Sequence, residues 1–448
     1  MMDFDVLFIG SGHATWHAAV ALLQAGKHVA IVERDLVGGT CTNYGCDAKI
    51  ALDAPLQLTE QLTRFNGSGV KGNVTIDWPS LMAYKHQVID PLAPSMSQMF
   101  TKMGIEMITG DGVLTDAHTV KVGERSYTAD KIVIGTGQRP ASLNIDGAEY
   151  IHDSREFLSL ADMPQRLTFI GAGVIAIEFA AMAATMGREV HVVEFTERAL
   201  SAFDKTYVDR LQAKLAQQGV QFHFGEAVNA VTKTAEGLTV TTKAGLTIQT
   251  DYVLGATGRV ANVENLGLEE LGIAASRRGI PVNDHLQTSV PNIYASGDII
   301  DKKQPKLTPT ATFESNYIAG QILGNTEPIS YPAIPSVVFA MPRIAEVGVT
   351  LATAQADDEY HTQVVPFGKQ LAFEYKHALD AEMTLVFDHA GDLVGASVYA
   401  DDAEELINVL TMVINGHFTG SQLRQQIFAF PSSTSGILDL LAGMLSQA

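Results

Sequence analysis

The sequence predicts an α/β protein that contains two copies of one βαβ unit and ends in a smaller α+β unit. Two observations carry this prediction. Residues 6–33, VLFIGSGHATWHAAVALLQAGKHVAIVE, recur as residues 167–194, LTFIGAGVIAIEFAAMAATMGREVHVVE, at a constant offset of 167 − 6 = 161 residues. Near the C-terminus, residues 383–418 read as a strand, a glycine-containing turn, a second strand and an amphipathic helix.

Each copy of the repeat reads as a buried strand, a tight glycine turn, a helix and a second strand that ends in an acidic residue. The first glycine permits the sharp bend from strand to helix, and the second lets the backbone approach a pyrophosphate. The pyrophosphate then lies at the helix N-terminus, and the acid accepts a hydrogen bond from a ribose hydroxyl. These residues are Gly10, Gly12 and Glu33 in the first copy and Gly171, Gly173 and Glu194 in the second. The sequence therefore predicts two Rossmann-like dinucleotide-binding domains.

The two copies differ at informative positions. In the first, Thr15 stands where glycine or alanine is usual, and we expect a slightly wider gap between helix and strand to absorb its extra atoms. In the second, Glu194 favours a free 2′-hydroxyl and repels a 2′-phosphate. Glu197 adds negative charge and Arg198 is the only nearby cation, so we expect NADH in preference to NADPH.

The composition is that of a soluble globular protein and excludes several partners. The 448 residues carry a formal net charge of −20 without a cluster of Lys or Arg, which argues against nucleic acid and anionic membrane surfaces. The N-terminal stretch lacks the features of a signal peptide, and no run of about 18 apolar residues occurs, so we expect a cytoplasmic protein. No Cys/His cluster has the spacing of a zinc site, and we expect no resident metal ion.

Cys41 and Cys46 are the only cysteines, and they lie in the stretch GGTCTNYGCDAK, residues 38–49. In the cytosol, two nearby cysteines are more often catalytic or metal-binding than structural. The stretch follows the first βαβ unit within a few residues, so a flavin bound by that unit would bring its ring near both thiols. A thiolate is the reactive form of cysteine, and a nearby cation such as Lys49 stabilises it.

At this point the sequence resembles the flavoprotein disulfide reductases, the class I pyridine nucleotide-disulfide oxidoreductases that include glutathione reductase, dihydrolipoamide dehydrogenase and mercuric reductase. The resemblance runs from end to end of the chain. Beyond the two βαβ units and the cysteine stretch, it is carried by GTGQRP (135–140), GATGRVAN (255–262), NIYASGDI (292–299), KLTPTA (306–311) and IPSVVFAMPRIAEVG (334–348).

The resemblance implies an FAD-dependent enzyme in which hydride passes from NADH to the flavin and then to a redox-active disulfide between Cys41 and Cys46. Cys46 would form a charge-transfer contact with the flavin, and Cys41 would attack the substrate. Lys49 would pair with Glu178 beside the reactive flavin nitrogen. These four residues form the implied catalytic set.

The motifs and the resemblance together imply a larger set of cofactor-binding residues. Asp298 would hold the ribityl chain of FAD, and Thr308 and Ala311 lie in the helix start that would face the pyrimidine end of the flavin. The full implied set is Gly10, Gly12, Glu33, Gly39, Thr40, Thr136, Gly137, Gly171, Gly173, Glu194, Gly258, Asp298, Thr308 and Ala311.

The sequence departs from the family pattern beside the second cysteine. Ala48 stands where the family usually has a proline. Asp47 follows Cys46 directly, and its carboxylate should disfavour the Cys46 thiolate unless it points away or pairs with Lys49.

A larger departure lies near the C-terminus. Family members that reduce disulfides carry a His-Pro and, a few residues later, a Glu, and the dimer partner supplies both as the acid that protonates the departing thiolate. In this chain Phe430 and Ser435 fall at those two places. A positioned general acid contributes about 10²–10⁴ in rate, so we expect poor reduction of an ordinary disulfide.

Three functions remain open from the sequence. In the first, an NADH-dependent flavoenzyme cycles Cys41–Cys46 against a small acceptor that needs no such acid, namely a metal ion, a polysulfide or an unusual small disulfide. In the second, a diaphorase or NADH oxidase passes electrons from the flavin directly to quinone or oxygen. In the third, the protein is a non-catalytic redox or NADH sensor that signals through its dimer surface.

The expected architecture has four segments: an FAD domain over 1–147, an NAD domain over 148–257, a central segment on the FAD side over 258–328 and an α+β dimerisation domain over 329–448. We expect a homodimer. In the last segment, we expect an apolar helical stripe at core or subunit contacts, a structural rather than metal-binding acidic run at 401–405, and a tail helix over 435–448 packed on the partner subunit.

Overall fold

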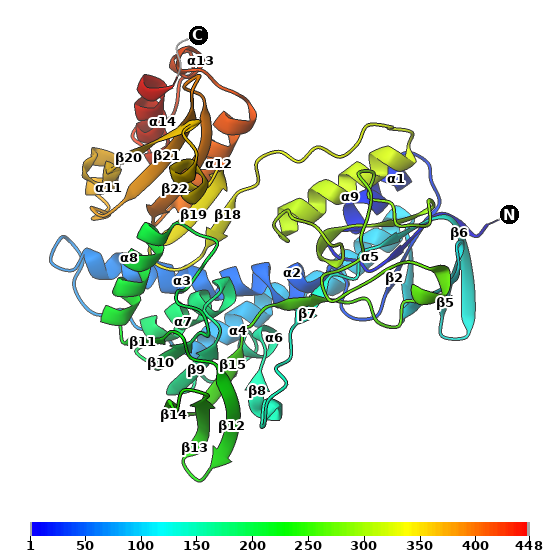
Figure 1. Cartoon of the computed structure of the whole chain (residues 1–448), viewed down its shortest axis with the longest axis horizontal. Coiled ribbons are helices and arrows are strands. Elements are labelled where there is room, and N and C mark those ends of the chain that lie inside the picture. Colours follow the sequence, from blue (N-terminus) through cyan, green and yellow to red (C-terminus); the bar gives the residue numbers. More distant parts are fainter. Residues whose placement is uncertain (1, 446–448) are drawn as a thin grey trace.

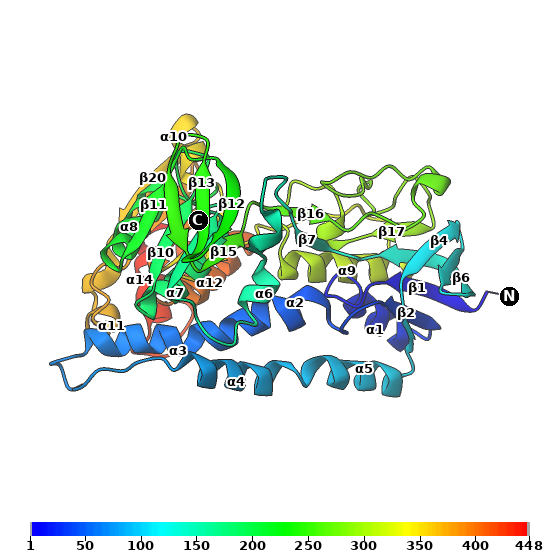
Figure 2. The same cartoon turned by 90° about the horizontal axis from the view of Figure 1, so that it is seen from below.

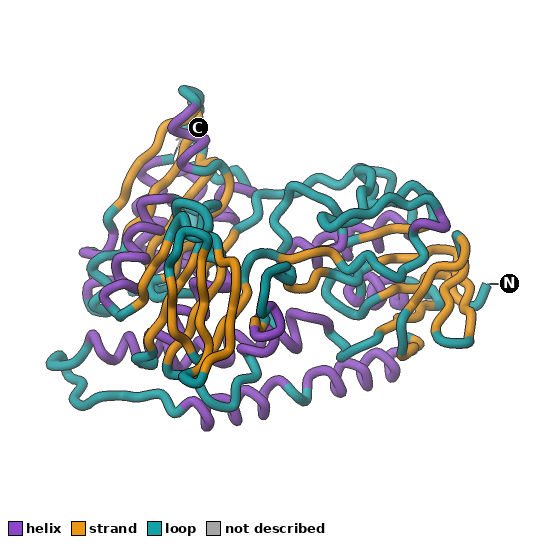
Figure 3. Tube along the Cα trace, turned by 60° about the horizontal axis from the view of Figure 1, so that its bottom comes forward, coloured by secondary structure: helices purple, strands orange, loops and turns teal. Residues whose placement is uncertain are grey.

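The structure, a computed structural model, describes residues 2–445. Figure 1 shows three parts: an N-terminal part, a central part and a C-terminal part that stands apart from the N-terminal part. Residues near 300 return to the N-terminal part. The strands form separate sheets rather than one continuous sheet (Figure 3). None of the helices within residues 2–445 is long and apolar enough to span a bilayer.

The N-terminal part is built on a sheet of strand order β3-β2-β1-β6-β5-β4, in which β17 also pairs with β6. The strands β3, β2, β1, β6 and β17 are parallel neighbours, and α1 packs against α9. The elements are β1 (Phe4–Ile9), α1 (Trp16–Gln24), β2 (Val29–Glu33), α2 (Gly39–Tyr44), α3 (Cys46–Arg64), α4 (Trp78–Ile89), α5 (Leu92–Met103), β3 (Glu106–Thr109), β4 (Gly112–Asp116), β5 (Thr119–Val122), β6 (Arg125–Ile134), β17 (Ile293–Ala295) and α9 (Thr308–Ile322).

The central part is built on a parallel sheet of order β11-β10-β9-β15-β8, beside an antiparallel sheet β12-β13-β14. The antiparallel pair β7 and β16 joins it to the N-terminal part. The elements are β7 (Gln138–Pro140), β8 (Ile151–His152), α6 (Ser154–Phe157), β9 (Arg166–Ile170), α7 (Val174–Thr185), β10 (Glu189–Val193), α8 (Lys205–Gln217), β11 (Val220–His223), β12 (Val228–Thr234), β13 (Gly237–Thr242), β14 (Thr247–Thr250), β15 (Tyr252–Gly255) and β16 (Arg259–Ala261).

The internal repeat is reproduced in strand register. Val6 pairs with Val29 between β1 and β2, and Leu167 pairs with Val190 between β9 and β10, which are the same two positions displaced by the repeat offset. In both units a glycine turn leads from the first strand into a helix whose inner face is buried. The prediction of two Rossmann-like domains is therefore confirmed.

The C-terminal part is an antiparallel sheet of order β18-β19-β22-β21-β20 with α12 and α14 packed in its core. The predicted strand–turn–strand–helix is confirmed as β21, β22 and α12. The elements are β18 (Ser336–Val338), β19 (Arg343–Gly348), α10 (Leu351–Ala356), β20 (Tyr360–Val365), α11 (Leu371–Glu374), β21 (Glu382–Asp388), β22 (Leu393–Ala400), α12 (Ala403–Asn415), α13 (Gly420–Arg424) and α14 (Ser433–Met444).

Three features were expected in this C-terminal part: an apolar stripe, an acidic run and a tail helix. The apolar stripe of α12 belongs to the core of its own domain; its residues are Leu406, Ile407, Leu410 and Ile414. The acidic run is structural, because ion pairs join Arg64 to Asp401, Lys376 to Asp402 and Arg343 to Glu404. The expectation that the tail packs on a partner was wrong for the apolar side chains of α14, which are buried in the same core; residues 446–448 lie outside the described residues.

The helix α3 connects the three parts. Figure 2 shows it running below the central part and the C-terminal domain with α4 alongside, while α2 and α5 continue toward the N-terminal sheet. Its side chain Asp53 accepts a hydrogen bond from Arg343 of β19 at 3.0 Å, and both residues are buried. This contact ties the helix that begins at Cys46 to the C-terminal sheet.

Thr15 is accommodated by a different route from the one expected. The side chain is fully buried, and its hydroxyl donates to the carbonyls of Gly10 at 2.7 Å and Gly12 at 2.9 Å. Its methyl group occupies the space in front of Gly135, where an added Cβ would lie 2.3 Å from Thr15 Cγ2. The room comes from the missing side chain at Gly135, so the helix need not move away from the strand.

We predict that Gly135→Ala destabilises the protein by roughly 1–3 kcal/mol, the usual cost of overpacking a core. Thr15→Ser in the same chain removes the clashing methyl and keeps the hydroxyl, so the double variant should recover most of the loss. Urea unfolding of the two single variants, the double variant and the parent measures this. Additive effects in the double variant would contradict the proposed contact.

Candidate active site

The two thiols lie at the junction of two helices. Cys41 is in the middle of α2 and Cys46 is the first residue of α3, with Gly45 between the helices. A Cβ on Gly45 would lie 3.0 Å from the carbonyl oxygen of Thr40, so the tight turn that brings the thiols together favours glycine. Both cysteines are free thiols in the structure, and they are hydrogen-bonded to each other.

The surroundings shift the pKa values of the two cysteines in opposite directions. The hydrogen bond from Cys41 lowers the pKa of Cys46 to about 6, and the Thr308 hydroxyl and the charge of Lys49 act in the same direction. Burial and Asp47 oppose this effect without cancelling it. The same hydrogen bond and burial raise the pKa of Cys41. At neutral pH the site therefore holds a Cys46 thiolate beside a Cys41 thiol.

Thr308 has a second role that the sequence did not indicate. It opens α9, and its Oγ1 lies 3.4 Å from Cys46 Sγ. A hydroxyl at this distance can donate to a thiolate sulfur, which explains its effect on the pKa of Cys46. Sequence reasoning placed Thr308 only against the flavin, because the helix that carries it is 262 residues away along the chain.

Lys49 and Glu178 form the ion pair that the resemblance implied. The Lys49 ammonium donates to both carboxylate oxygens of Glu178 at 2.9 Å, from the first turn of α3 to the buried face of α7. The Glu178 side chain also accepts from the backbone N–H of Phe339 at 2.8 Å, and the Phe339 ring lies 4.1 Å below the ammonium. Lys49 is thus held by Glu178 and not by Asp47, which leaves the carboxylate of Asp47 near the thiols.

The residues of the first glycine turn fit a dinucleotide. Gly10 has φ +103°, and a Cβ there would lie 2.5 Å from the carbonyl oxygen of Gly135. Gly39 has φ +69°, and a Cβ there would lie 2.9 Å from the Cα of Gly12. The loop before α1 and the start of α2 therefore approach each other as bare backbone, which is the surface that a pyrophosphate needs at a helix N-terminus.

The two acids of the repeat make equivalent hydrogen bonds. Glu33 accepts from the backbone N–H groups of Ser11 and Asp35, both at 2.9 Å. Glu194 accepts from the backbone N–H groups of Ala172 and Thr196, both at 2.8 Å. Ala172 corresponds to Ser11 and Thr196 to Asp35, because each pair is separated by the repeat offset of 161 residues. Each acid is held at the end of the second strand, and carboxylate oxygens keep acceptor capacity for a ribose hydroxyl.

A buried carboxylate organises the segment around Asp298. Glu314 of α9 is fully buried and accepts from the backbone N–H of Gly297 at 2.6 Å, from Lys302 at 2.6 Å and from Tyr331 at 2.7 Å. These contacts fix the backbone on which Asp298 sits. Sequence reasoning missed Glu314; its only signal was an acid in the middle of an otherwise apolar helical face.

Other predicted cofactor residues lie where the chain returns between domains. The Thr136 hydroxyl donates to the carbonyl of Asn262 at 2.9 Å, and the Asn262 amide donates to the carbonyl of Thr136 at 2.8 Å, so the two return segments are tied together. Gly137 has φ +66° and Gly258 has φ +115°, with nothing within 4 Å of an added Cβ. Ala311 is buried in the second turn of α9.

The structure shows how Phe430 and Ser435, which replace the His and the Glu of the family, are placed. Phe430 is 79% exposed. Ser435 is buried and committed to the start of α14, because its N–H donates to the Ser432 hydroxyl at 3.1 Å and its hydroxyl donates to the Ser432 carbonyl at 3.0 Å. Neither residue can supply or orient a proton. No histidine within residues 2–445 is hydrogen-bonded to either thiol.

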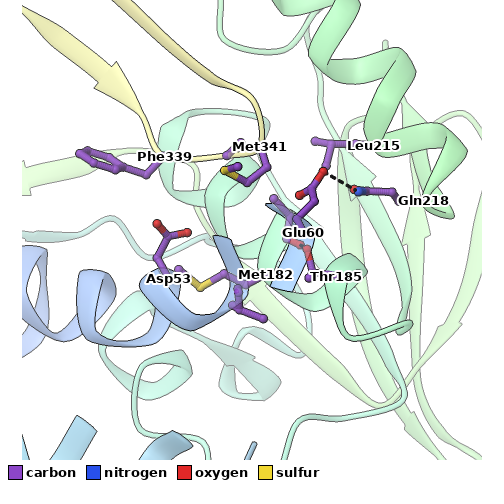
Figure 4. Close-up of a pocket in the computed structure, with 11 residues that line it drawn as sticks. Asp53, Glu60, Met182, Thr185, Leu215, Gln218, Phe339 and Met341 are labelled. Carbon is purple, nitrogen blue, oxygen red and sulfur yellow. Dashed lines mark hydrogen bonds between the residues drawn. The ribbon is translucent and has the colours of Figure 1, made fainter. Parts of the chain in front are cut away.

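A small cavity lies among α3, α7, the end of α8 and residues 339–341 (Figure 4). Its volume is about 10 Å³, which is room for a single water molecule. Asp53, Glu60, Met182, Phe339 and Met341 are among the residues that line it. The cavity is a packing defect at the junction of helices and too small for a substrate.

Comparison with known proteins agrees with the geometry. The sequence matches the pyridine nucleotide-disulphide oxidoreductase family over residues 4–315 and the dimerisation domain of that family over residues 334–440. It is 33% identical to a dihydrolipoyl dehydrogenase of Geobacillus stearothermophilus, covering 96% of this chain and 94% of the relative. It is 32% identical to a glutathione reductase of Nostoc sp., covering 96% and 98%.

Solved structures give the same result. The HOCl-induced flavoprotein disulfide reductase RclA of Escherichia coli superimposes with a TM-score of 0.88 at 26% identity, covering 98% of this chain and 99% of that one. A copper(II) complex of the same protein, with one cysteine changed to serine, superimposes with a TM-score of 0.89 at 25% identity, covering 99% and 100%. This chain therefore belongs to the pyridine nucleotide-disulphide oxidoreductase family and is an FAD-dependent NAD(P)H oxidoreductase of the flavoprotein disulfide reductase type.

Proposed function

We propose that this enzyme takes hydride from NADH and delivers the electrons through Cys41 and Cys46 to a thiophilic metal ion, with copper(II) as the acceptor. The observation that carries the proposal is a pair of adjacent free thiols, with Thr308 Oγ1 3.4 Å from Cys46 Sγ, in a chain whose family acid is replaced by Phe430 and Ser435. The copper(II) complexes of RclA, a structural neighbour, support a metal ion over the other acceptors.

The residues of the chain supply binding, orientation and charge. FAD, when bound, would supply the redox chemistry between a hydride donor and the disulfide. The bare backbone at Gly10, Gly12 and Gly39 would hold its pyrophosphate, and the Lys49–Glu178 pair fixes a cation beside the thiols. Thr308 and Lys49 then stabilise the Cys46 thiolate as the disulfide opens.

The electron count fits two metal ions per NADH. NADH and the disulfide give NAD⁺, the Cys41 thiol and the Cys46 thiolate. Two copper(II) ions then take one electron each, the S–S bond forms again and the Cys41 proton leaves to solvent. The net reaction is NADH plus two copper(II) to NAD⁺, two copper(I) and one proton.

This reaction does not need the missing acid. Reduction of a disulfide substrate releases a thiolate that must be protonated, and a positioned acid contributes about 10²–10⁴ to that step. A metal ion that accepts an electron releases no such leaving group. The loss of both the His and the Glu of the family would therefore slow disulfide reduction by about that factor and leave metal reduction unaffected.

The nucleotide preference proposed is for NADH. The Arg198 side chain donates to the backbone carbonyls of Ala199, Leu200 and Phe203, so it is not available to a 2′-phosphate. Glu194 is buried at the end of β10, where it repels such a phosphate.

We also propose that the active form is a homodimer. The matched dimerisation domain supports this, and so do large apolar side chains that the single chain leaves exposed on that domain: Ile427 is 100% exposed, Phe430 79% and Met412 67%. Exposed apolar groups gathered on one domain are typical of an interface. The family arrangement would bring Phe430 to the dithiol of the partner subunit, where a phenyl ring keeps the pocket apolar.

Cys41→Ser tests the route of the electrons. Because the dithiol is the donor, we expect copper(II)-dependent NADH oxidation to fall by about 100-fold or more, as when an essential reactive group is removed. Quinone reduction, which draws on the flavin directly, should fall far less. Anaerobic NADH oxidation with each acceptor, at matched flavin content, measures both. Equal losses with both acceptors, or undiminished copper reduction, would favour direct transfer from the flavin.

Thr308→Val tests the origin of the thiolate. The pKa of Cys46 is lowered to about 6, so the thiolate is present above that pH and is lost as the pH falls through it. Removing the hydroxyl should move the midpoint upward by about one pH unit. The pH dependence of Cys46 alkylation in NADH-reduced enzyme, followed by mass spectrometry, reports the midpoint. Thr310→Val is the matched control, because that buried hydroxyl has no hydrogen-bond partner.

The nucleotide preference is tested by kcat/KM. We expect the value for NADH to exceed that for NADPH by at least about tenfold, which corresponds to about 1.4 kcal/mol. Phe195 follows Glu194 and is exposed, so Phe195→Arg should narrow the ratio by offering a cation to the 2′-phosphate, whereas Phe195→Gln should not. Equal use of both nucleotides by the parent enzyme would contradict the assignment.

A further inference from the structure

Two histidines and a threonine gather at the start of α1. His13 lies in the glycine turn, His17 is the second residue of α1, and Thr312 lies on α9, which packs against α1. His13 Nδ1 and His17 Nε2 are 3.2 Å apart, Thr312 Oγ1 is 3.2 Å from His17 Nε2, and it is 3.5 Å from His13 Nδ1. Three polar atoms from three side chains thus converge on one point.

The triangle that these atoms form has the size of one face of a metal coordination shell. With metal–imidazole bonds of roughly 2.0–2.1 Å, an ion bonded to all three atoms lies just above the centre of the triangle. His13 precedes α1 and His17 lies in its first turn, and the turn that leads into the helix places the two imidazole rings 5.3 Å apart between centroids. No cluster of three or more His, Cys, Asp or Glu side chains within residues 2–445 is arranged to hold a metal, so this site depends on the hydroxyl as its third ligand.

The packing around the two imidazole rings holds them in place. Both His13 and His17 are half-buried. The ring of Trp16 stacks on His17 at a centroid distance of 3.5 Å and fixes its orientation. Asp47, which follows Cys46, interacts electrostatically with His13 and adds negative charge near the cluster.

The cluster lies beside the dithiol. Thr308 and Thr312 are four residues apart on α9, so they lie on the same side of that helix about 6 Å apart along its axis. Thr308 Oγ1 is 3.4 Å from Cys46 Sγ. The three-atom cluster is therefore about one helical turn from the thiolate.

We propose that His13, His17 and Thr312 form an entry site that holds copper(II) before the dithiol reduces it. The identity of the ion and its fate rest on the proposed function; the three-ligand site itself rests on the geometry. Imidazole and oxygen ligands suit copper(II), which also binds such sites more tightly than the other divalent first-row ions do. Thiolate sulfur suits copper(I), so the transfer runs from the nitrogen site toward the sulfur site as the ion gains its electron.

The binding step balances without a change of protonation. Each neutral imidazole carries its proton on the nitrogen that faces away from the ion, and the Thr312 hydroxyl ligates without losing its proton. In the reduction that follows, each copper(II) takes one electron from the Cys41–Cys46 pair. Two ions restore the disulfide and release one proton.

Electron paramagnetic resonance of the oxidised holoenzyme with one equivalent of copper(II) tests the site. In that state the sulfurs are bonded to each other, and we expect hyperfine splitting from two imidazole nitrogens. His17→Gln and His13→Gln should each remove one nitrogen and raise the KM for copper(II) by at least about tenfold. His86→Gln, an exposed histidine on α4, is the matched control and should behave as the parent. Flavin content and flavin bleaching by NADH establish that each variant is folded.

The outcomes separate the two proposals. A two-nitrogen signal that persists in both histidine variants, or is absent from the parent, overturns the entry site. If the parent shows the signal and both variants lose it, the site stands even where NADH fails to reduce the bound ion, and only the proposed function is then lost. If reduction requires Cys41 but is indifferent to His13 and His17, the entry site fails and the proposed function stands. Thr312→Val should weaken copper binding while both nitrogens remain.

Discussion

One polar stripe along α3 holds the parts of the molecule around the dithiol. Its side chains recur every three or four residues, so they lie on one side of the helix, and together they contact four other segments. They pair with α7, β19, the end of β22 and α8; the stripe residues are Lys49, Asp53, Gln57, Glu60 and Arg64. Breaking a buried pair of this kind costs roughly 3–5 kcal/mol. Because Cys46 opens the same helix, the ion pairs that assemble the domains also fix the thiolate.

The stripe also explains how the site tolerates Asp47. Lys49 is fully engaged by Glu178, so it acts on Cys46 as a fixed charge and does not swing to the neighbouring carboxylate. Hydrogen bonds from Cys41 and Thr308 add to that charge, and together they outweigh Asp47. The carboxylate that should weaken the thiolate is left near His13. Under the proposed entry site, Asp47 would lower the stability of the thiolate slightly and would favour a bound cation.

The sequence predicted most of the fold because the information is local. The repeat, its glycines and its terminal acids lie within 28-residue stretches, and Cys41, Cys46 and Lys49 lie within one turn region. What it could not predict depends on contacts between distant segments. Gly135 makes room for Thr15, and Thr308 reaches Cys46, only because sheets and helices bring them together. The tail helix was misassigned for the same reason, since an amphipathic pattern shows that a face is buried but not against which chain.

Under the proposed function, the lost acid and the histidine pair answer the same chemical requirement. An enzyme that cleaves a disulfide substrate must protonate a leaving sulfur, and a charged histidine at the thiols serves that step. An enzyme that reduces a metal ion must first hold the ion, and neutral histidines with free lone pairs serve that step instead. In this chain the position of the first kind of histidine holds Phe430, while His13 and His17 lie together at the start of α1. The two features are independent in sequence, and under the proposed function both would favour metal binding over proton transfer.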